Sequence, residues 1–320
     1  MRIAVIGVGV VGQIHINVLL EQRFNIVAIC DIDTDKTKEY PTIPAYTDYQ
    51  EMIEKEKPDA VHICTPHYLH KEMVVYALKR DIHVLCEKPL CIKREDIDEI
   101  LTVEKDSKAQ LGVCFQNRYL PCNQYLKGYL KDKQVQCAFA SLAWTRDKEY
   151  YDSAPWRGSK AFEGGGLLIN QAIHTLDLLI WLLDEPQYVT ASVTNLTLKE
   201  VIDVEDTATL ICSGKANFVF SATNGSKAFF SAEVRFQTDT DRIRLFDNKL
   251  EINDKIMTFE NDKKFFGKEC YGWGHAVIIE DFYDCLQTGR KFPIDGIEGT
   301  KALKLVLSAY KSQGEKIPVR

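Results

Sequence analysis

The chain opens with MRIAVIGVGVVG, residues Met1–Gly12, an apolar run of β type that passes into a glycine-rich turn. The glycines of this turn are Gly7, Gly9 and Gly12. Residues 10–21 contain no proline and predict a helix, so the turn connects a strand to a helix. In such a turn, the first glycine permits the tight bend, the second lets backbone N–H groups approach a pyrophosphate, and the third brings the helix close to the strand.

An acidic residue follows at the position that a nicotinamide-dinucleotide site requires. Asp31 closes a second apolar run, 25–30, about 20 residues beyond the glycines. A carboxylate there accepts hydrogen bonds from the ribose hydroxyls of NAD and repels the 2′-phosphate of NADP. Lys36 and Lys38 are near enough to bind a phosphate, so we expect NAD and keep NADP as the alternative. The cofactor-binding residues expected in this region are Gly7, Val8, Gly9, Val10, Val11, Gly12, Asp31 and Ile32.

Composition excludes several classes of protein. The formal net charge is −6 and no Lys/Arg stripe is interleaved with aromatic residues, so we expect no nucleic-acid partner. The ten cysteines form no CxxC pair and mostly lie in apolar runs, which favours free thiols in a reducing, cytoplasmic compartment. We expect no signal peptide, because the chain enters its first strand at once. The longest apolar stretch, 166–183, contains Asn170, Gln171, His174 and Asp177 and predicts a buried helix, not a membrane span.

The patterning predicts two domains with different sheets. Residues 1–118 alternate apolar strands with amphipathic helices, which predicts a dinucleotide-binding domain with a doubly wound parallel sheet of Rossmann type. Residues 119–320 change to longer strands with tight turn sequences. They predict a substrate-binding and oligomerisation domain of α/β class with a large, open, mainly antiparallel sheet. The strands predicted in the first domain are Arg2–Ile6, Asn25–Cys30, Ala60–Cys64, His83–Cys86 and Gln110–Phe115.

One lysine lies in the loop after the fourth predicted strand, within Cys86-Glu87-Lys88-Pro89-Leu90. Ligands of doubly wound sheets bind outside the carboxyl ends of the strands, so we expect Lys88 to face the cofactor crevice. There it could hydrogen-bond a substrate hydroxyl or relay its proton. From Glu-Lys-Pro alone, a solvated lysine at a strand end is the stronger alternative.

A second polar cluster occupies residues 163–177, EGGGLLINQAIHTLD. Its three glycines are expected to let the backbone approach a ligand. On the helix that follows, the i, i+4 and i+7 spacing places Asn170, His174 and Asp177 on one face. A histidine there can act as general base, and an asparagine can fix a substrate hydroxyl. A satisfied core histidine is the alternative, but three polar residues on an apolar helix favour a site.

Together these motifs resemble the glucose-fructose oxidoreductase and inositol dehydrogenase family, often written Gfo/Idh/MocA. The resemblance extends over Ile3–Gly12, Asp59–His70, Glu87–Pro89, Gly164–Asp177 and Pro293–Tyr310. It implies an NAD(P)-dependent oxidoreductase that transfers a hydride between nicotinamide and the hydroxyl-bearing carbon of a sugar, sugar derivative or cyclitol. It also implies a homodimer or homotetramer that forms through the sheet of the second domain.

The resemblance assigns the catalytic roles to Lys88 and His174, which match the family's lysine and histidine. Asn170 stands where many members, inositol dehydrogenases among them, carry aspartate. An amide cannot take up a proton at neutral pH, so the proton relay falls on His174. This departure weakens an assignment to myo-inositol.

Further positions are expected to complete the site. The additional cofactor-binding residues are Thr65, Pro66, His67, His70, Glu87, Lys88 and Asn117, and the substrate-binding residues are Lys88, Arg118, Trp156, Arg157, Asn170 and His174. Trp156 can present a flat apolar face to a sugar ring, and Arg157 can bind a hydroxyl or carboxylate. The sequence supports a structural hinge at 117–118 as well as it supports a binding role for these residues. It also supports a surface loop at 150–160, packed by its own tryptophan, as well as a sugar-binding loop.

The sequence contains one histidine pair with metal-ligand spacing and one further candidate substrate edge. His67 and His70 form an HxxH pair, but no third ligand accompanies them and hydride transfer needs no metal, so we expect none. Tyr271, Trp273 and His275 form another candidate substrate edge.

Two other functions are compatible with this sequence. The same site can oxidise one hydroxyl transiently, acidify the neighbouring C–H bond, and so cleave a glycosidic substituent or epimerise the substrate before the hydride returns. The third function is a non-enzymatic, dinucleotide-binding regulator. The presence of Lys88 and His174 disfavours it.

Overall fold

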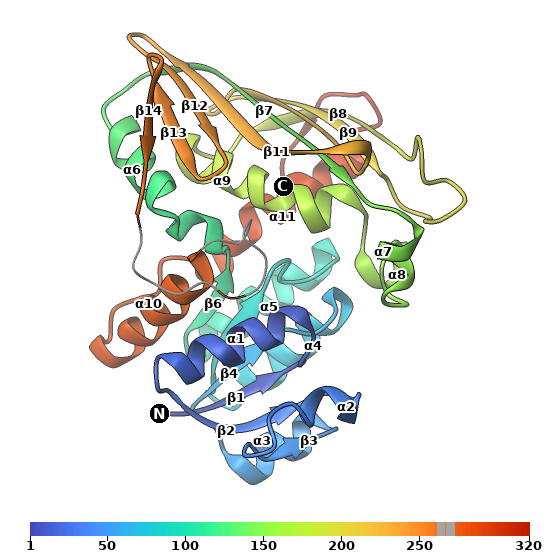
Figure 1. Cartoon of the computed structure of the whole chain (residues 1–320), viewed down its shortest axis with the longest axis vertical. Helices are drawn as coiled ribbons and strands as arrows, with labels where there is room; N and C mark the ends of the chain where they lie inside the picture. Colours follow the sequence, from blue (N-terminus) through green and yellow to red (C-terminus); the bar gives the residue numbers. More distant parts are fainter. Residues whose placement is uncertain (261–265, 267–272) are drawn as a thin grey trace. The chain divides into compact units, whose positions relative to one another are not determined.

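The computed structural model describes residues 1–260, 266 and 273–320 (Figure 1). Two compact units are present: Met1–Tyr119 with Lys263–Thr300, and Leu120–Asp262 with Lys301–Arg320. The predicted boundary at residue 118 assigns everything after it to the second domain, whereas the described residues 273–300 belong to the first unit. Phe282 and Phe292 approach the backbone of Gly112 so closely that an added Cβ would lie 3.0 Å from either ring.

The first unit is built on a six-stranded parallel sheet with strand order β3-β2-β1-β4-β5-β6. Its strands are β1 (Arg2–Ile6), β2 (Asn25–Cys30), β3 (Ala45–Tyr46), β4 (Ala60–Ile63), β5 (His83–Glu87) and β6 (Leu111–Cys114). Its helices are α1 (Val10–Glu21), α2 (Thr34–Thr37), α3 (Tyr49–Glu56), α4 (His67–Leu78), α5 (Arg94–Asp106), η1 (Gln116–Tyr119) and α10 (Gly274–Thr288). Apart from the edge strand β3, the strands are mostly buried, as apolar strands covered by helices must be. The predicted doubly wound parallel sheet is confirmed.

The second unit is built on a nine-stranded sheet with order β14-β13-β12-β11-β7-β10-β9-β8-β15. Its strands are β7 (Val135–Thr145), β8 (Tyr188–Thr194), β9 (Thr207–Ser213), β10 (Phe218–Thr223), β11 (Gly225–Thr238), β12 (Arg242–Phe246), β13 (Lys249–Ile252), β14 (Lys255–Thr258) and β15 (Ile317–Pro318). Its helices are α6 (Pro121–Leu130), α7 (Lys148–Asp152), α8 (Lys160–Glu163), the π-helical turn η2 (Leu168–Ala172) and α9 (Ile173–Leu183), with the later part of α11 (Gly296–Ser312).

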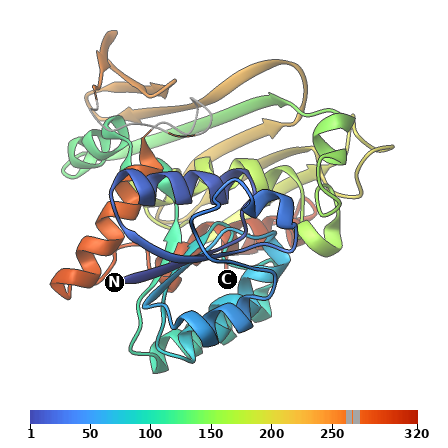
Figure 2. The ribbon, with the colours of Figure 1, turned by 60° about the horizontal axis from the view of Figure 1, so that its bottom comes forward.

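Neighbouring strands of this second sheet are antiparallel except β7 and β10, which confirms the predicted mainly antiparallel sheet. In Figure 2 the long green strand β7 lies beside the long orange strand β11. Asp247-Asn248 and Asn253-Asp254 have positive φ at both residues and form the hairpin turns of β12–β13 and β13–β14. The turn at Asn224-Gly225 is different, because the strands it joins lie on opposite sides of β7.

One helical stretch, Lys160–Leu183, is the only one among the described residues that is long and apolar enough to cross a membrane. Within the structure, 78% of its most apolar window is buried. This burial is that of a core helix.

Candidate functional site

The glycine turn between β1 and α1 leaves open space at one position only. Gly7 has a φ of +89°, and an added Cβ would lie 2.7 Å from the Cys64 carbonyl. At Gly12 an added Cβ would lie 1.8 Å from the Gly7 oxygen, whereas at Gly9 it would meet no atom within 4 Å. The first unit therefore needs Gly7 and Gly12 for its own packing. Gly9, at the N-terminus of α1, borders space of the kind that a pyrophosphate fills.

Asp31, at the end of β2, holds the glycine turn in place. Its Oδ2 accepts the backbone N–H of Val8 at 2.7 Å, and its Oδ1 accepts that of Asp33 at 2.9 Å. Each carboxylate oxygen has a second lone pair, so the group can still accept ribose hydroxyls. The side chain of Ile32 is 89% exposed beside it, and Val10 is also exposed, while Val8 is buried. The residues at this edge therefore fit a dinucleotide.

At the start of the loop after β5, Lys88 reaches the surface between buried neighbours. Every residue from 84 to 91 is buried except Lys88, which is partly exposed. The Lys88–Pro89 peptide is cis. The Glu87 carboxylate accepts the backbone N–H of Lys88 through Oε2 at 3.2 Å. This places the lysine side chain at the surface from a buried, hydrogen-bonded backbone.

Two predicted cofactor ligands use their side chains inside the first unit. The ring nitrogens of His70 lie 2.7 Å from the backbone oxygens of Pro89 and Thr65, so His70 ties the loop after β4 to the Lys88 loop. Burial lowers the pKa of His70, and both backbone oxygens oppose this effect. The Glu87 carboxylate contacts His15 through Oε1 at 3.1 Å. We assign both side chains to holding these loops.

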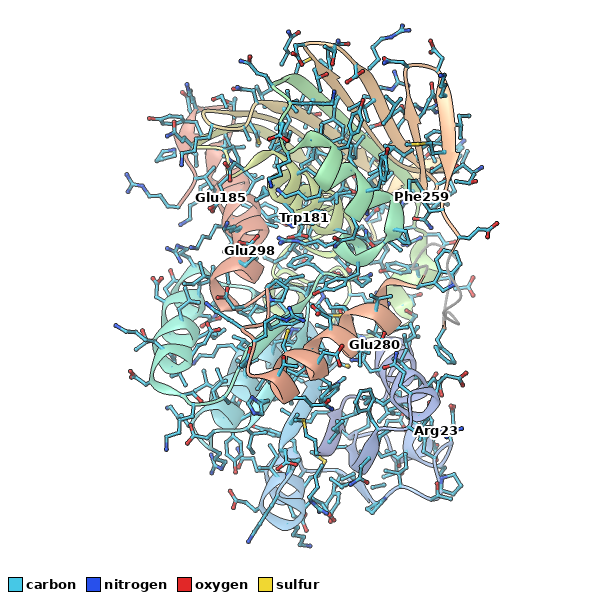
Figure 3. All side chains as sticks on the ribbon, turned by 90° about the vertical axis from the view of Figure 1, so that its left-hand side faces the viewer. Arg23, Trp181, Glu185, Phe259, Glu280 and Glu298 are labelled. Atoms are coloured by element: carbon cyan, nitrogen blue, oxygen red, sulfur yellow. The ribbon has the colours of Figure 1, made fainter. Side chains whose placement is uncertain are left out.

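The remaining predicted positions of the first unit divide in the same way. Pro66 is the N-cap residue of α4, Thr65 and Asn117 are partly exposed, and His67 is buried. Arg118 is buried and donates to Glu298, labelled in Figure 3, at 2.8 Å.

The predicted substrate edge near α10 is not supported by its histidine. His275 is buried, and its Nε2 lies 3.5 Å from the Glu87 carboxylate. Trp273 is partly exposed, and Tyr271 lies outside the described residues.

In the second unit, the glycines that precede η2 serve internal packing. An added Cβ at Gly165 would lie 2.0 Å from the Tyr310 hydroxyl oxygen, and one at Gly166 would lie 2.1 Å from the Glu205 backbone oxygen. The absence of a side chain at these two glycines is therefore required by the protein's own packing. Glu205 accepts the N–H groups of Gly166 and Leu168, each at 2.9 Å, and so caps the start of this helical stretch.

Two polar side chains interrupt the buried helical stretch that follows. Between residues 165 and 180, every residue is buried except Asn170 and His174, which are partly exposed. Asn170 lies within the π-helical turn, a distortion that is frequent at functional sites. Asp177, predicted on the same face, is buried and so does not share their exposure.

Glu163 holds the side chain of Asn170, although the sequence motifs predict no role for it. Its carboxylate is 1% exposed and accepts the Asn170 Nδ2–H and, at 2.5 Å, the backbone N–H of Gly158. Burial raises the pKa of Glu163 to about 7, against the opposing effect of these hydrogen bonds and of Arg157. No periodic signal marks this residue, because it reaches Asn170 from the short helix α8.

The loop before α8 is tied to the same helical stretch. Arg157 donates to the Tyr150 hydroxyl at 2.6 Å, and its guanidinium lies 4.6 Å from the Tyr150 ring and 4.8 Å from that of Trp156. Gln171 also donates to the Tyr150 hydroxyl, at 3.1 Å. Tyr150 and Gln171 were missed from the sequence. They join the loop of Trp156 and Arg157 to the helix of Asn170.

Two family models match this chain. The oxidoreductase family model with an NAD-binding Rossmann fold matches residues 1–115, and the GFO/IDH/MocA C-terminal domain matches residues 134–245. The chain belongs to the Gfo/Idh/MocA family. Its first unit is an NAD-binding Rossmann domain, so the expected cofactor NAD is confirmed.

Relatives of known function are similar along much or all of the chain. The myo-inositol 2-dehydrogenase of Thermotoga maritima is 26% identical over 100% of this chain and 98% of its own length. The D-glucoside 3-dehydrogenase of Escherichia coli is 27% identical over 58% of this chain and 55% of its own. The WlbA dehydrogenase of Bordetella pertussis, solved with NADH and UDP-GlcNAcA, is 25% identical with a TM-score of 0.87, covering 100% and 98% of the two chains. These three relatives are dehydrogenases, and this chain is an oxidoreductase of the same family.

A matched pair of glycine substitutions separates cofactor binding from folding. Gly9→Ala places a methyl group in open space, so we expect an unchanged thermal midpoint without cofactor and NADH binding at least about tenfold weaker. Gly12→Ala forces the methyl against the Gly7 oxygen and is expected to destabilise the fold by about 1–3 kcal/mol. Thermal unfolding and NADH fluorescence titration measure the two effects. Unaltered NADH affinity in Gly9→Ala would contradict this account of the turn.

The contribution of Glu163 to the stability of the folded protein is expected to depend on pH. Its pKa in the folded protein is above the ordinary 4.5, so the folded state holds the proton more tightly and loses stability as pH rises from about 4.5 to 7. The loss amounts to at most about 3 kcal/mol. Between pH 5 and pH 8, unfolding of Glu163→Gln by urea should therefore show a smaller loss of stability than wild type.

Glu104→Gln is the matched control for this measurement. Burial raises the pKa of Glu104, in the first unit, to about 7 as well. Glu104→Gln should keep the part of the pH dependence that Glu163 causes, and the double variant should lose both parts. Identical pH dependence in Glu163→Gln and wild type would show that Glu163 does not titrate in this range.

Proposed function

We propose that this protein transfers a hydride between NAD and the hydroxyl-bearing carbon of a sugar, sugar derivative or cyclitol. The proposal rests on three polar side chains that are partly exposed within otherwise buried segments. Lys88 is the only partly exposed residue between 84 and 91, and Asn170 and His174 are the only two between 165 and 180. The assignment of Lys88 and His174 to one reaction comes from the family resemblance.

The chain's own residues supply proton transfer and charge stabilisation. NAD, when bound, supplies the nicotinamide that accepts or returns the hydride. His174 takes the hydroxyl proton as general base during oxidation and returns it during reduction. Lys88 donates a hydrogen bond to the same oxygen and stabilises its developing negative charge. The carbonyl oxygen of Asn170, whose amide donates to Glu163, accepts a second substrate hydroxyl.

Asp31 sets the preference for NAD over NADP. Its carboxylate would repel a 2′-phosphate, and the nearest cation, Lys36, already lies 3.7 Å from Asp31 and 3.5 Å from Asp33. The positive charge of Lys36 is therefore shared by two carboxylates. A 2′-phosphate would meet a net negative edge at this position.

Trp156 and Arg157 support a ring substrate with several hydroxyls. Both are partly exposed, and they present an aromatic face and a guanidinium from one loop. Such a pair binds the apolar face and the polar edge of a sugar ring. The cyclitol and the glucoside after which two relatives are named belong to the same chemical class.

Lys88→Ala and His174→Ala are expected to lower kcat/KM by about 10²–10⁴ while NADH affinity changes little. If both groups act on one proton transfer, the double variant should lose far less than the product of the single effects. Reduced-nicotinamide absorbance, followed over a panel of sugars, sugar acids, polyols and cyclitols with NAD and then NADP, measures this. Full turnover in Lys88→Ala would overturn its role.

The same panel separates the three functions. Free NADH released with a sugar or cyclitol supports the dehydrogenase. A cleaved or epimerised product without free NADH would favour the redox-neutral reaction instead. Tight NADH binding with no reaction on any compound would favour the regulator.

We also propose a cytoplasmic homodimer or homotetramer. The nine cysteines among the described residues are all free, which supports a reducing compartment. Three apolar side chains that are between 53% and 62% exposed lie on one face of the second sheet: Phe139, Ile211 and Phe230. Adjacent apolar side chains on one sheet face are typical of a self-association surface.

The sheet face is tested by charge substitution. Phe139→Glu with Ile211→Glu should convert an oligomer to monomers in analytical ultracentrifugation, because association would bury the two charges. Leu196→Glu is the control, since Leu196 is equally exposed but lies outside the sheet. A monomeric wild type, or an oligomer unaffected by the double substitution, would refute the proposed interface.

A further inference from the structure

The first unit buries four side chains of metal-ligand type behind the Lys88 loop. They are His15 of α1, Glu87 of β5, Cys114 of β6 and His275 of α10, and all are at least nine-tenths buried. One ligand atom from each lies within 4.8 Å of all the others. The sequence expectation of no metal was based on the HxxH pair, and none of these four residues belongs to that pair.

The separations within this cluster bracket those of a tetrahedral site. His15 Nε2 lies 3.1 Å and His275 Nε2 3.5 Å from Glu87 Oε1, and Cys114 Sγ lies 4.0 Å from His15 Nε2. Zinc binds nitrogen, oxygen and sulfur at about 2.0–2.3 Å, which separates ligand atoms in a tetrahedron by about 3.3–3.8 Å. Small side-chain movements would bring the four atoms to these distances.

A second set of hydrogen bonds orients the cluster as in metal sites. His15 Nδ1 lies 2.7 Å from His62 Nδ1, and His62 Nε2 lies 2.7 Å from the Tyr283 hydroxyl. A histidine that binds metal through Nε2 carries its proton on Nδ1 and donates it to such a neighbour. Glu87, which offers Oε1 to the cluster, uses Oε2 to accept the Lys88 N–H.

The charge of the cluster also matches a divalent ion. The Glu87 carboxylate and two neutral imidazoles would alone leave one negative charge buried, which is costly without a counter-charge. A divalent cation with the carboxylate, the Cys114 thiolate and two neutral imidazoles has a net charge of zero. Thiolate and imidazole ligands select zinc-like ions over magnesium or calcium.

We propose that His15, Glu87, Cys114 and His275 bind one zinc-class divalent ion, a structural site that fixes the backbone of Lys88. Binding releases the Cys114 thiol proton to solvent and changes no oxidation state. The site goes beyond the proposed dehydrogenase function, since a metal there takes no part in hydride transfer.

The test uses the full chain purified without a histidine tag from zinc-supplemented cells. Elemental analysis should find about one zinc per chain. After chelation, titration with Co²⁺ should give the absorption of a tetrahedral site together with a thiolate-to-cobalt charge-transfer band. Cys114→Ser should lose that band and most of the bound metal. Cys212→Ser, which alters an equally buried thiol in the second unit, should keep both.

Absence of zinc from the wild type, together with no cobalt band on titration, would overturn the proposal and leave a hydrogen-bonded cluster. A cobalt band that persists unchanged in Cys114→Ser would also overturn it. If Cys114→Ser fails to fold, the wild-type cobalt spectrum decides alone. None of these measurements depends on turnover, so the metal site and the proposed reaction fail or succeed separately.

Discussion

The Glu87 carboxylate makes the position of Lys88 depend on the interior of the first unit. One oxygen accepts the Lys88 backbone N–H, and the other contacts His15 and His275. His15 belongs to α1, the helix that begins at the glycine turn. The cofactor turn and the lysine loop are therefore held by one polar connection. A buried carboxylate is costly unless its oxygens are satisfied, so each of these contacts constrains the others.

The second unit uses buried carboxylates in a related way. Glu205 accepts two backbone N–H groups where the helical stretch before Asn170 begins, and the Tyr310 hydroxyl donates to it at 2.8 Å. Glu163 joins the Gly158 backbone to the Asn170 amide. In both units a buried acid fixes the backbone or side chain of a residue that faces outward. The exposed residues can then be precisely oriented without being part of the apolar core.

Sequence patterns predicted those helices and strands that are determined by residues close together in the sequence. Helix α1 and strand β1 follow the apolar run and the glycine turn, and the motifs around Lys88 and His174 predict their roles, which stay predictions. The packing of residues 273–300 in the first unit was not predictable, since it depends on aromatic rings that meet Gly112 from far along the chain. The His15 cluster gave no signal for the same reason, because its ligands come from four separate elements without motif spacing.

The asparagine at position 170 is best explained by Glu163. Its amide donates to the Glu163 carboxylate. An aspartate there would set two carboxylates in contact, and the pair could remain only by sharing a proton. Because burial raises the pKa of Glu163 to about 7, the Asn170–Glu163 pair still contains a group that can titrate near neutral pH. The departure from aspartate therefore moves the acidic group one side chain away from the exposed surface, and it leaves the neutral amide of Asn170 at the partly exposed position.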